Sequence, residues 1–511
     1  MVFELFFAGL ALFAAAPLWL VDHPPIQDLP QHLATIRVLV DHGDANLAFA
    51  EYFDVELGRT QYLAYYLAAQ LLSLGFGVAL ANKLLITAAI VGTPYAMRYL
   101  LRVLKRDEGH ALFVLPLTWN AHLILGFLNF IAAIPLMLLG LALAVDLRRR
   151  FETRRAVALG VVAFVAFYTH VVPFAFLALG AGMVGVGVNA RETAKRWLPL
   201  VPAGVATLFW LARSPAGEAT MNAALPGAGE GPQPVFMDSR QAMDQLPVWL
   251  TDVFHGPFDD RLLVAFGACL LLAVLLGRPR TPAERELVAG LPRLLWRVGL
   301  LAPIAAVAYF VAPVSYDWIW PINARFPLLA LLLFIPLLRP PRRWAEAALH
   351  SAVVVIAILS FQQASRAALA FEAEEVGELD AAIEAIPEGS RVAGLIFASG
   401  SRHVKFSPFV HSVAYVQAER GGAVMFTFAD FLQSPIRFRE ENRPPRVPPR
   451  WEWTPARVDP AHDLDWYGYV LTRGGPGRIA GMPGRWEPIF EREPWRVYRR
   501  RDPLTPATTP P

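Results

Sequence analysis

A long series of apolar runs constrains the fold of this chain more than any other feature. Each run approaches the roughly 20 residues that an α-helix needs to cross the hydrocarbon core of a bilayer. We expect eleven membrane-spanning helices, over residues 4–21, 79–101, 111–124, 127–146, 156–170, 172–189, 197–212, 261–277, 296–313, 326–338 and 345–361. The chain is 55% hydrophobic and 17% charged, which is too apolar for a soluble protein of 511 residues. The predicted fold class is an α-helical polytopic membrane protein.

Arginine and lysine lie in short clusters between these runs, and their distribution predicts the orientation. Basic loops stay on the cytoplasmic side of a membrane. One orientation fits every cluster if residues 61–77 form an amphipathic interfacial or re-entrant helix instead of a span. The N-terminus is then cytoplasmic, and residues 22–60, 213–260, 314–325 and the region after 362 are extracytoplasmic. This pattern predicts a multi-pass protein of the inner (plasma) membrane and gives no argument for nucleic acid as a partner.

The composition becomes polar and charged near residue 362. We therefore expect a membrane domain over 1–361, whose outer loop 22–78 carries juxtamembrane helices, and a small extracytoplasmic domain over 362–502. The expected elements of this second domain are strands at 391–397, 423–428 and 466–472, a helix at 410–419 and a final hairpin of 486–490 with 495–499. The order strand, helix, strand favours an α/β domain. Residues 503–511 are expected to be a disordered tail.

Several classes of chemistry are excluded by motifs that the sequence lacks. There is neither a GxxxxGK[ST] loop nor a dinucleotide fingerprint, so nucleotide hydrolysis and hydride transfer have no site. The single cysteine, Cys269, excludes disulfides within the chain and thiolate metal sites. We therefore expect any chemistry to occur on the outer face.

The first outer loop begins with two carboxylates and two imidazoles directly after the first apolar run. Asp28 and His32 are four residues apart, so a helix beginning between them brings them close together. The carboxylate can accept a proton from a hydroxyl, and the imidazole can share a proton or bind a metal. Alternatively, Asp28 and Gln31 have the spacing of a capping box, although a capping Asp can also be catalytic. Asp22 and His23 are either ordinary loop residues or, with the other pair, ligands of a divalent metal.

A second outward cluster lies at residues 316–326. The indole rings of Trp318 and Trp320 can stack on sugar rings or lie in the interfacial aromatic belt, and Asp317 stands between the aromatic residues. Arg325, at the mouth of a span, can hold a phosphate through two hydrogen bonds or extend to lipid head groups.

Three more polar residues belong to the same predicted face. His170 stands at the outer end of a span, and Asn120 and His122 stand near a short outward turn. Each can line a cavity or be an ordinary buried polar residue. The predicted orientation brings all of them to one side of the membrane.

The layout resembles the GT-C superfamily of membrane glycosyltransferases, which includes the protein O-mannosyltransferases and the aminoarabinose lipid A transferase. The resemblance is carried by the acidic first outer loop, Asp28-Leu29-Pro30-Gln31-His32, and by Thr60-Gln61-Tyr62-Leu63-Ala64-Tyr65-Tyr66, which is similar to the family's juxtamembrane helix. The span after Leu80-Ala81-Asn82-Lys83-Leu84 follows in the family's order. The similarity of layout covers about residues 1–361. The chain has Pro30 and His32 where better-known members often place Arg or Glu.

The resemblance implies a donor, a base and a substrate site. The donor would be a polyprenyl-phosphate sugar, and the acceptor a hydroxyl or amine of a lipid, glycan or protein. Asp28 would be the general base with His32 beside it, and Arg325, Arg59 or Lys83 would stabilise the leaving phosphate. The remaining residues expected at the substrate site are Tyr62, His170, Asp317, Trp318 and Trp320. No cofactor is required, and a divalent metal is left open.

Two other functions remain as alternatives. The first is a non-catalytic membrane protein that binds or transports lipid-linked glycans. Transport requires polar or ionisable residues deep in the spans, whereas polar residues here collect at the span ends. The second is a metal-dependent hydrolase of lipid phosphates, which requires two of His23, His32, His122 and His170 to converge on one metal.

Overall fold

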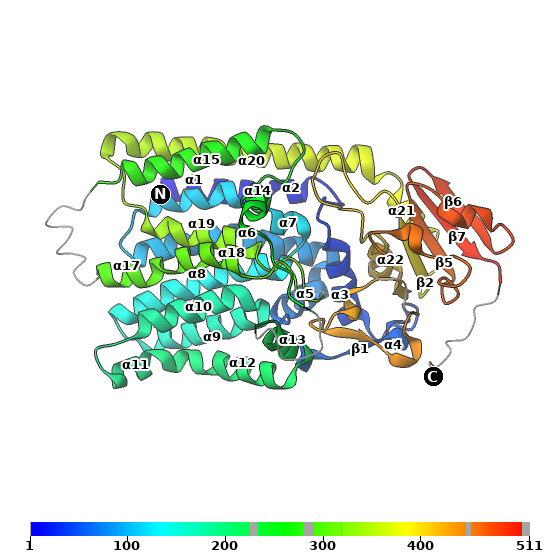
Figure 1. Ribbon diagram of the computed structural model, residues 1–511, viewed down its shortest axis with the longest axis horizontal. Helices are drawn as coiled ribbons and strands as arrows, with labels where there is room; N and C mark the ends of the chain where they lie inside the picture. The colour runs from blue at the N-terminus through cyan, green and yellow to red at the C-terminus, as the bar shows by residue number, and fades with distance from the viewer. Residues whose placement is uncertain (1, 225–232, 279–290, 318, 446–450, 503–511) are drawn as a thin grey trace. The chain divides into compact units, whose positions relative to one another are not determined.

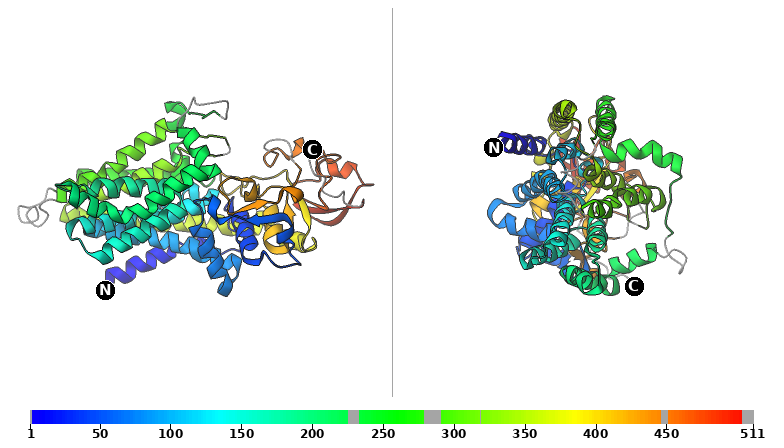
Figure 2. Two further views of the ribbon diagram at one scale, coloured as in Figure 1. Left: turned by 90° about the horizontal axis from the view of Figure 1, so that it is seen from below. Right: turned by 90° about the vertical axis from the view of Figure 1, so that its left-hand side faces the viewer.

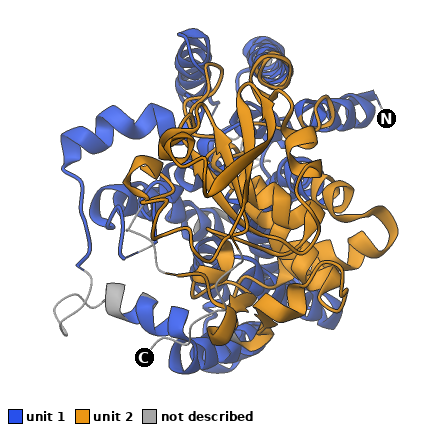
Figure 3. Ribbon diagram, turned by 90° about the vertical axis from the view of Figure 1, so that its right-hand side faces the viewer, with its two compact units in different colours: residues 1–17, 85–123, 127–365 blue, residues 18–84, 124–126, 366–511 orange. Residues whose placement is uncertain are grey.

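The structure is a computed structural model that describes residues 2–224, 233–278, 291–317, 319–445 and 451–502. The predicted tail, 503–511, and the candidate Trp318 lie outside these residues. The chain divides into two compact units (Figure 3). Unit 1 comprises residues 1–17, 85–123 and 127–365, and unit 2 comprises residues 18–84, 124–126 and 366–511.

Helices and the loops between them make up the described part of unit 1, with isolated β-bridges such as Val235 with Ser315. Its helices are α1 (Val2–Phe13), α6 (Val78–Val103), α8 (Leu128–Arg149), α9 (Thr153–Thr169), α10 (Val171–Gly185), α11 (Ala190–Trp197), α12 (Val201–Arg213), α13 (Pro215–Ala224), α14 (Ser239–Leu250), α15 (Phe258–Leu275), α17 (Leu291–Gly299), α18 (Leu301–Val311), α19 (Arg325–Phe334) and α20 (Arg343–Phe371). Of these, α6 begins in unit 2 and α20 ends there. Short helices α2 (Ala16–Trp19) and α7 (Ala121–Leu125) and the 3₁₀ segments η2 (Glu108–Leu117), η3 (Leu198–Leu200) and η4 (Ile335–Leu337) complete unit 1. Helices α8, α9, α10 and α12 run alongside one another (Figures 1 and 2).

Four helical stretches in the described residues are long and apolar enough to cross a membrane: Val78–Val103, Leu128–Arg149, Leu294–Val311 and Trp344–Val376. Shorter apolar helices are Val2–Phe13, Ala64–Phe76, Val171–Gly185 and Arg325–Leu337. Large apolar side chains point outward from several helices, with Leu208, Phe209, Val264 and Leu275 each at least 60% exposed. Such a surface is expected of helices that face lipid. The helical membrane class is therefore supported, and the number of spans and their orientation stay predictions.

The expected span over 111–124 is wrong as a single helix. The structure has instead η2, then a break, then the five-residue α7. Pro116 removes one backbone donor from this stretch. Asn120 then starts a new helix, because its side-chain oxygen accepts from the backbone N–H groups of His122 and Leu123 at 3.0 and 3.2 Å. Residues 109–117 are all buried. The stretch is therefore apolar because it lies in the protein interior, and not because it forms one membrane-spanning helix.

Unit 2 combines the first outer loop with the C-terminal region. Its helices are α3 (Leu29–Asp41), α4 (Phe49–Tyr52), α5 (Ala64–Phe76), a π-helical turn (Glu372–Val376), α21 (Leu379–Glu384) and α22 (Val413–Arg420). Its strands are β1 (Phe53–Val55), β2 (Arg391–Ile396), β3 (Ala423–Val424), β4 (Ile436–Phe438), β5 (Tyr469–Arg473), β6 (Trp486–Arg492) and β7 (Trp495–Arg500). Its 3₁₀ segments are η1 (Leu57–Arg59), η6 (Phe428–Asp430), η7 (Glu440–Asn442), η8 (Pro455–Arg457) and η9 (Gly477–Gly481).

The main sheet of unit 2 has the order β3-β2-β5-β7-β6. Strand β2 pairs in parallel with β3 and β5, and β7 pairs antiparallel with β5 and β6. The predicted strand at 391–397 and the predicted final hairpin are confirmed, whereas the strand expected over 423–428 has only two residues. Central strands are buried, which is why β2 and β5 read as apolar runs.

A second, two-stranded sheet joins the two sequence regions of unit 2. β1 pairs antiparallel with β4 in the register Phe53 to Phe438 and Val55 to Ile436. The rings of Phe53 and Phe438 stack with centroids 4.9 Å apart. In addition, α3 packs against α22. The first outer loop is therefore built into the same compact unit as the C-terminal sheet.

Candidate active site

The loop before α3 is held by the backbone of residues 124–126. The N–H groups of Gln27 and Asp28 donate to the carbonyls of Ile124 and Leu125 at 2.9 and 3.1 Å. Gly126 follows with φ +84°, and a Cβ there would lie 2.8 Å from the Asp28 nitrogen and 2.9 Å from its Cβ. Only glycine accepts both this conformation and this approach. Gly126 therefore allows the loop to carry Asp28 to its position.

Asp28 does not cap α3 through its side chain. It occupies the N-cap position with no side-chain hydrogen bond to the helix. Gln31 does not complete a capping box either, because its amide donates to the Phe426 carbonyl at 3.0 Å and its oxygen accepts from the Phe428 N–H at 3.1 Å. The capping interpretation is therefore wrong, and the Asp28 carboxylate is available for another role.

The partner of Asp28 is His411, which precedes α22. Asp28 Oδ1 and His411 Nδ1 are 3.0 Å apart, and the two side chains are only 12% and 8% exposed. A carboxylate can only accept, so Nδ1 carries the hydrogen and donates it. The His411 ring is held by stacking on Phe426, with centroids 4.9 Å apart and planes at 21°. In the described residues no other hydrogen bond engages this carboxylate, so Oδ2 can take a proton.

His411 was missed by the sequence reasoning. It stands 383 residues after Asp28, and no helical or strand spacing relates the two. The available signal was weak: a histidine at the start of the helix expected over 410–419 in the polar C-terminal region. Its importance follows only from the packing of α22 on α3.

His32 is fully engaged as a buried neutral imidazole. Its Nε2 lies 2.9 Å from the Gly126 carbonyl and its Nδ1 lies 2.9 Å from the Tyr66 hydroxyl. One tautomer satisfies both contacts, with Nε2–H donating to the carbonyl and the Tyr66 hydroxyl donating to Nδ1. Burial lowers the pKa of His32 to about 4. The ring therefore supports the loop that carries Asp28, and neither ring nitrogen is open to substrate.

The other candidates of the first loop have separate partners. The Lys83 ammonium donates to the Val21 carbonyl at 2.7 Å. Tyr62 is half-buried, and its backbone N–H donates to the Thr60 hydroxyl at 2.9 Å. Arg59 ends η1, and its side chain lies outside what the structure describes.

His23 belongs to a different cluster from Asp28 and His32. Its Nδ1 lies 3.4 Å from a Glu372 carboxylate oxygen and its Nε2 lies 3.1 Å from Asp380. Burial acts against the charged ring, yet these two carboxylates raise the pKa of His23 above its usual value. Asp22 is exposed. Among the described residues, the four loop side chains do not come together as one set of metal ligands.

In unit 1, aromatic rings connect Arg325 with two histidines. Arg325 begins α19, donates to the Pro321 carbonyl and lies over the Phe127 ring at 5.2 Å. The His122 ring lies 6.0 Å from Phe127 and 4.9 Å from Phe130, and Phe130 in turn lies 5.3 Å from His170. His170 also caps α10, since its Nδ1 accepts from the Val172 N–H at 3.1 Å. A guanidinium at a helix N-terminus favours an anion.

Asp317 and Trp320, the other described candidates of the second cluster, are both exposed. Tyr316 and Ile319 exchange backbone hydrogen bonds of 3.1 and 2.9 Å. Asp317, which follows Tyr316, has φ +51°. Trp320 is 46% exposed and packs edge-on against Trp249, with centroids 5.9 Å apart. The side chains of Asp317 and Trp320 are therefore accessible.

Comparison with known proteins bears on the fold. No protein-family profile matches the chain, and no curated protein matches it in sequence. Among solved structures, it is similar to ArnT from Cupriavidus metallidurans bound to undecaprenyl phosphate, with a TM-score of 0.57, 12% identity and 97% of each chain covered. ArnT from the same organism in the apo state matches with a TM-score of 0.53, again at 12% identity and 97% coverage of each chain. At 12% identity these similarities concern the fold alone: the chain shares the fold of ArnT, in agreement with the fold that the resemblance implies.

Proposed function

We propose that this protein is a membrane glycosyltransferase that moves a sugar from a polyprenyl-phosphate donor to a hydroxyl or amine, with Asp28 as general base. The observation that carries the proposal is the Asp28 carboxylate itself. It stands at a helix start without capping it, and within the described part of the chain only one of its oxygens is engaged, by His411 at 3.0 Å. A buried acid held in this way is arranged for proton transfer.

The reaction needs a base, a leaving group and a nucleophile. Asp28 Oδ2 accepts the proton of the acceptor hydroxyl or amine while that atom attacks the anomeric carbon of the donor. The bond from the anomeric carbon to the phosphate oxygen breaks, and the lipid phosphate leaves with the electron pair. A polyprenyl-phosphate donor is favoured because the similar ArnT structure contains undecaprenyl phosphate and this sequence has no nucleotide motif.

His411 and His32 act as positioning residues in this proposal. His411 donates to Oδ1 and so directs Oδ2 toward the acceptor, and its ring cannot rotate freely because it stacks on Phe426. His32 takes the role of a buried support in place of the catalytic role that its spacing suggested, since both ring nitrogens are engaged. Gly126 completes the support from the backbone side.

For the leaving phosphate we propose Arg325 as the stabilising cation. It is buried, at 9% exposure, and stands at the N-terminus of α19, where the helix dipole adds to its charge. Lys83 is a weaker candidate because its ammonium already donates to the Val21 carbonyl. Asp317, Trp320 and Tyr62 remain proposed contacts for the sugar or acceptor.

The alternatives are less well supported. A transport or binding protein for lipid-linked glycans gives no reason for a carboxylate held by a histidine. A metal-dependent hydrolase requires two of four histidines to share a metal, whereas His23 and His32 have separate protein partners. We also propose, from the distribution of basic residues, that transfer occurs on the extracytoplasmic face of the inner membrane.

A panel of donors tests the proposal. Purified full-length protein in nanodiscs is incubated with polyprenyl-phosphate sugars or, in parallel, with nucleotide sugars, together with an extract of envelope lipids and glycans. Mass spectrometry follows the release of polyprenyl phosphate. We expect release from lipid-linked donors alone and a loss of at least about 100-fold in Asp28→Asn.

Asp44→Asn is the matched control. Asp44 is an exposed residue of the same unit whose side-chain oxygen accepts from the Asn46 N–H, a contact that asparagine preserves. Its turnover should equal that of wild type. Consumption of nucleotide sugars, or equal turnover in Asp28→Asn and wild type, contradicts the proposal.

A further inference from the structure

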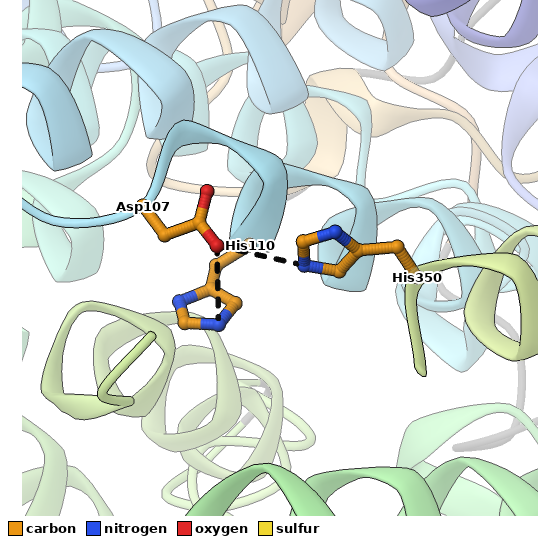
Figure 4. A group of neighbouring side chains, drawn as sticks. All are labelled: Asp107, His110 and His350. Carbon is orange, nitrogen blue, oxygen red and sulfur yellow. Dashed lines mark ion pairs between the residues drawn. The ribbon is translucent and has the colours of Figure 1, made fainter. Parts of the chain in front are cut away.

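A cluster of one carboxylate and two imidazoles lies in unit 1, separate from the residues discussed above. Asp107 Oδ2 is 4.0 Å from His110 Nε2 and 3.9 Å from His350 Nε2. One possible ligand atom from each residue lies within 4.8 Å of the other two. Figure 4 shows the carboxylate of Asp107 directed toward both rings.

Local structure explains why two of the three side chains meet. Asp107 is the N-cap of η2, and its Oδ1 accepts from the Gly109 N–H at 2.9 Å. This cap turns the other oxygen, Oδ2, toward the imidazoles. A 3₁₀ helix has three residues per turn, so side chains at i and i+3 lie above one another. His110 is therefore placed on the same side as Asp107.

The third side chain, His350, belongs to α20, and its ring packs closely against Gly109. A Cβ at Gly109 would lie 2.5 Å from His350 Cε1 and 3.0 Å from its Nδ1. Any larger residue at this position must move the imidazole. The close packing of η2 against the His350 ring thus depends on a residue without a side chain.

Four polar atoms of this cluster are buried and have no hydrogen bond within the described residues. His110 is completely buried, and in the described residues neither of its ring nitrogens has a hydrogen-bond partner. The same holds there for Asp107 Oδ2 and His350 Nε2. Separations of 3.9 and 4.0 Å are too long for hydrogen bonds between these groups. Each buried polar group without a hydrogen bond reduces the stability of the fold by about 1–3 kcal/mol. A ligand bound to all three side chains would remove this loss.

We propose that Asp107, His110 and His350 bind a divalent transition-metal ion, with Zn²⁺ as the best fit. Two imidazole nitrogens and one carboxylate oxygen suit zinc, whereas Mg²⁺ and Ca²⁺ prefer oxygen ligands. In a tetrahedral zinc site the ligand atoms are about 3.4 Å apart, so the observed separations need to contract by only about 0.5 Å for each Asp–His pair. A water molecule completes the coordination.

The ion fastens η2 to α20, two segments far apart in sequence. Metal binding to the folded state alone stabilises that state. The neighbouring cation, Arg106, is directed elsewhere, because its guanidinium donates to the carbonyl of Pro336 at 3.0 Å and to that of Leu337 at 3.4 Å. The role is structural and does not depend on the proposed glycosyl transfer.

Calorimetric titration with Zn²⁺ tests the site in the purified, EDTA-treated full chain. We expect one equivalent to bind, Co²⁺ to give the visible absorption of a tetrahedral nitrogen- and oxygen-ligated ion, and Zn²⁺ to raise the melting temperature. Asp107→Asn keeps the cap to Gly109 but loses the anionic ligand, so it should weaken binding at least about tenfold. His350→Gln should weaken it as strongly.

Two further variants separate ligand loss from misfolding. Gly109→Ala retains all three ligands but displaces the His350 ring, so it should also weaken binding. His462→Gln removes an exposed histidine that pairs with Asp459 alone at 2.9 Å and should leave zinc binding unchanged. If wild type binds no zinc, or if monodisperse Asp107→Asn and Gly109→Ala bind it as wild type does, the site does not exist.

Discussion

The chain contains two buried clusters of carboxylate and imidazole, and they differ in one informative way. In unit 2 the Asp28 and His411 atoms are 3.0 Å apart and form a hydrogen bond. In unit 1 Asp107 lies 3.9 and 4.0 Å from two histidines and bonds to neither. Asp107 uses one oxygen to cap its helix, whereas Asp28 does not cap the helix that it precedes. We therefore propose that the same residue types serve proton transfer in unit 2 and bind a cation in unit 1.

Each cluster also depends on one glycine. Replacing Gly126 or Gly109 by alanine should reduce the stability of the protein by different amounts. Gly126→Ala combines a positive φ with contacts to the Asp28 backbone, so we expect a loss of at least about 3 kcal/mol of stability. Gly109→Ala has no such φ and meets side-chain atoms alone, those of the His350 ring and the Asp107 carboxylate, so it should destabilise the protein clearly less. Thermal melts in detergent compare them.

Gly400→Ala is the control for these melts, because Gly400 is exposed and nothing lies within 4 Å of an added Cβ. Its melting temperature should match that of wild type. A Gly126→Ala protein as stable as Gly400→Ala contradicts the account of how Asp28 is held.

Lowering the pH should reduce the stability of unit 2, because His32 binds a proton more readily in the unfolded chain. The ring has a pKa of about 4 in the folded protein against 6.5 as the ordinary value, so the unfolded chain binds more protons between these limits. Stability is therefore complete above about pH 7 and falls as the pH drops toward 4, by up to about 3 kcal/mol. Melting temperatures at several pH values measure this loss.

The variant His32→Gln removes the titrating group and should show a shallower dependence on pH over the same window. Its melting temperature at pH 7.5 should be lower than that of wild type, because the contacts to Gly126 and Tyr66 are weakened. Identical slopes in variant and wild type would show that His32 is not buried as a neutral ring.

Removing His411 should lower turnover with little change in KM. We expect His411→Ala to reduce kcat about 10- to 100-fold, because Asp28 loses the donor that orients it. His411→Asn places an amide donor near the position of Nδ1 and should restore much of the rate. A kcat in His411→Ala equal to that of wild type removes His411 from the mechanism.

The smallest expected effects are those of a variant in one cluster on the property assigned to the other cluster. Asp107→Asn should change the transfer rate less than about twofold, because the proposed zinc ion has a structural role and takes no part in the transfer. Asp28→Asn should leave zinc binding unchanged. Measuring the transfer rate and zinc binding in both variants shows whether the two clusters act independently. A large effect of Asp107→Asn on transfer, or of Asp28→Asn on zinc binding, would show that they are coupled.

The features that could be predicted from sequence are those carried by neighbouring residues. Apolar runs predicted helices such as α8 and α20, and two short segments separated by residues 491–494 predicted the β6–β7 hairpin. The prediction of a membrane-spanning helix over 111–124 was wrong, because apolarity alone does not distinguish such a helix from the buried 3₁₀ segment η2.

The candidate site was predictable only in part. The loop sequence identified Asp28, but local spacing favoured capping as strongly as catalysis. The decision between them came from His411 and from the Gln31 contacts to Phe426 and Phe428, about 400 residues away. Contacts of such sequence separation leave no periodic pattern in a single chain. The pairing of β1 with β4 was hidden for the same reason.

The central claim is that the Asp28 carboxylate takes the acceptor's proton, and single-turnover transfer with bound donor tests it most directly. Donor affinity and transfer rate are measured separately in wild type and Asp28→Asn. The account predicts unchanged donor affinity and transfer slowed at least about 100-fold. Transfer at the wild-type rate in Asp28→Asn would contradict it.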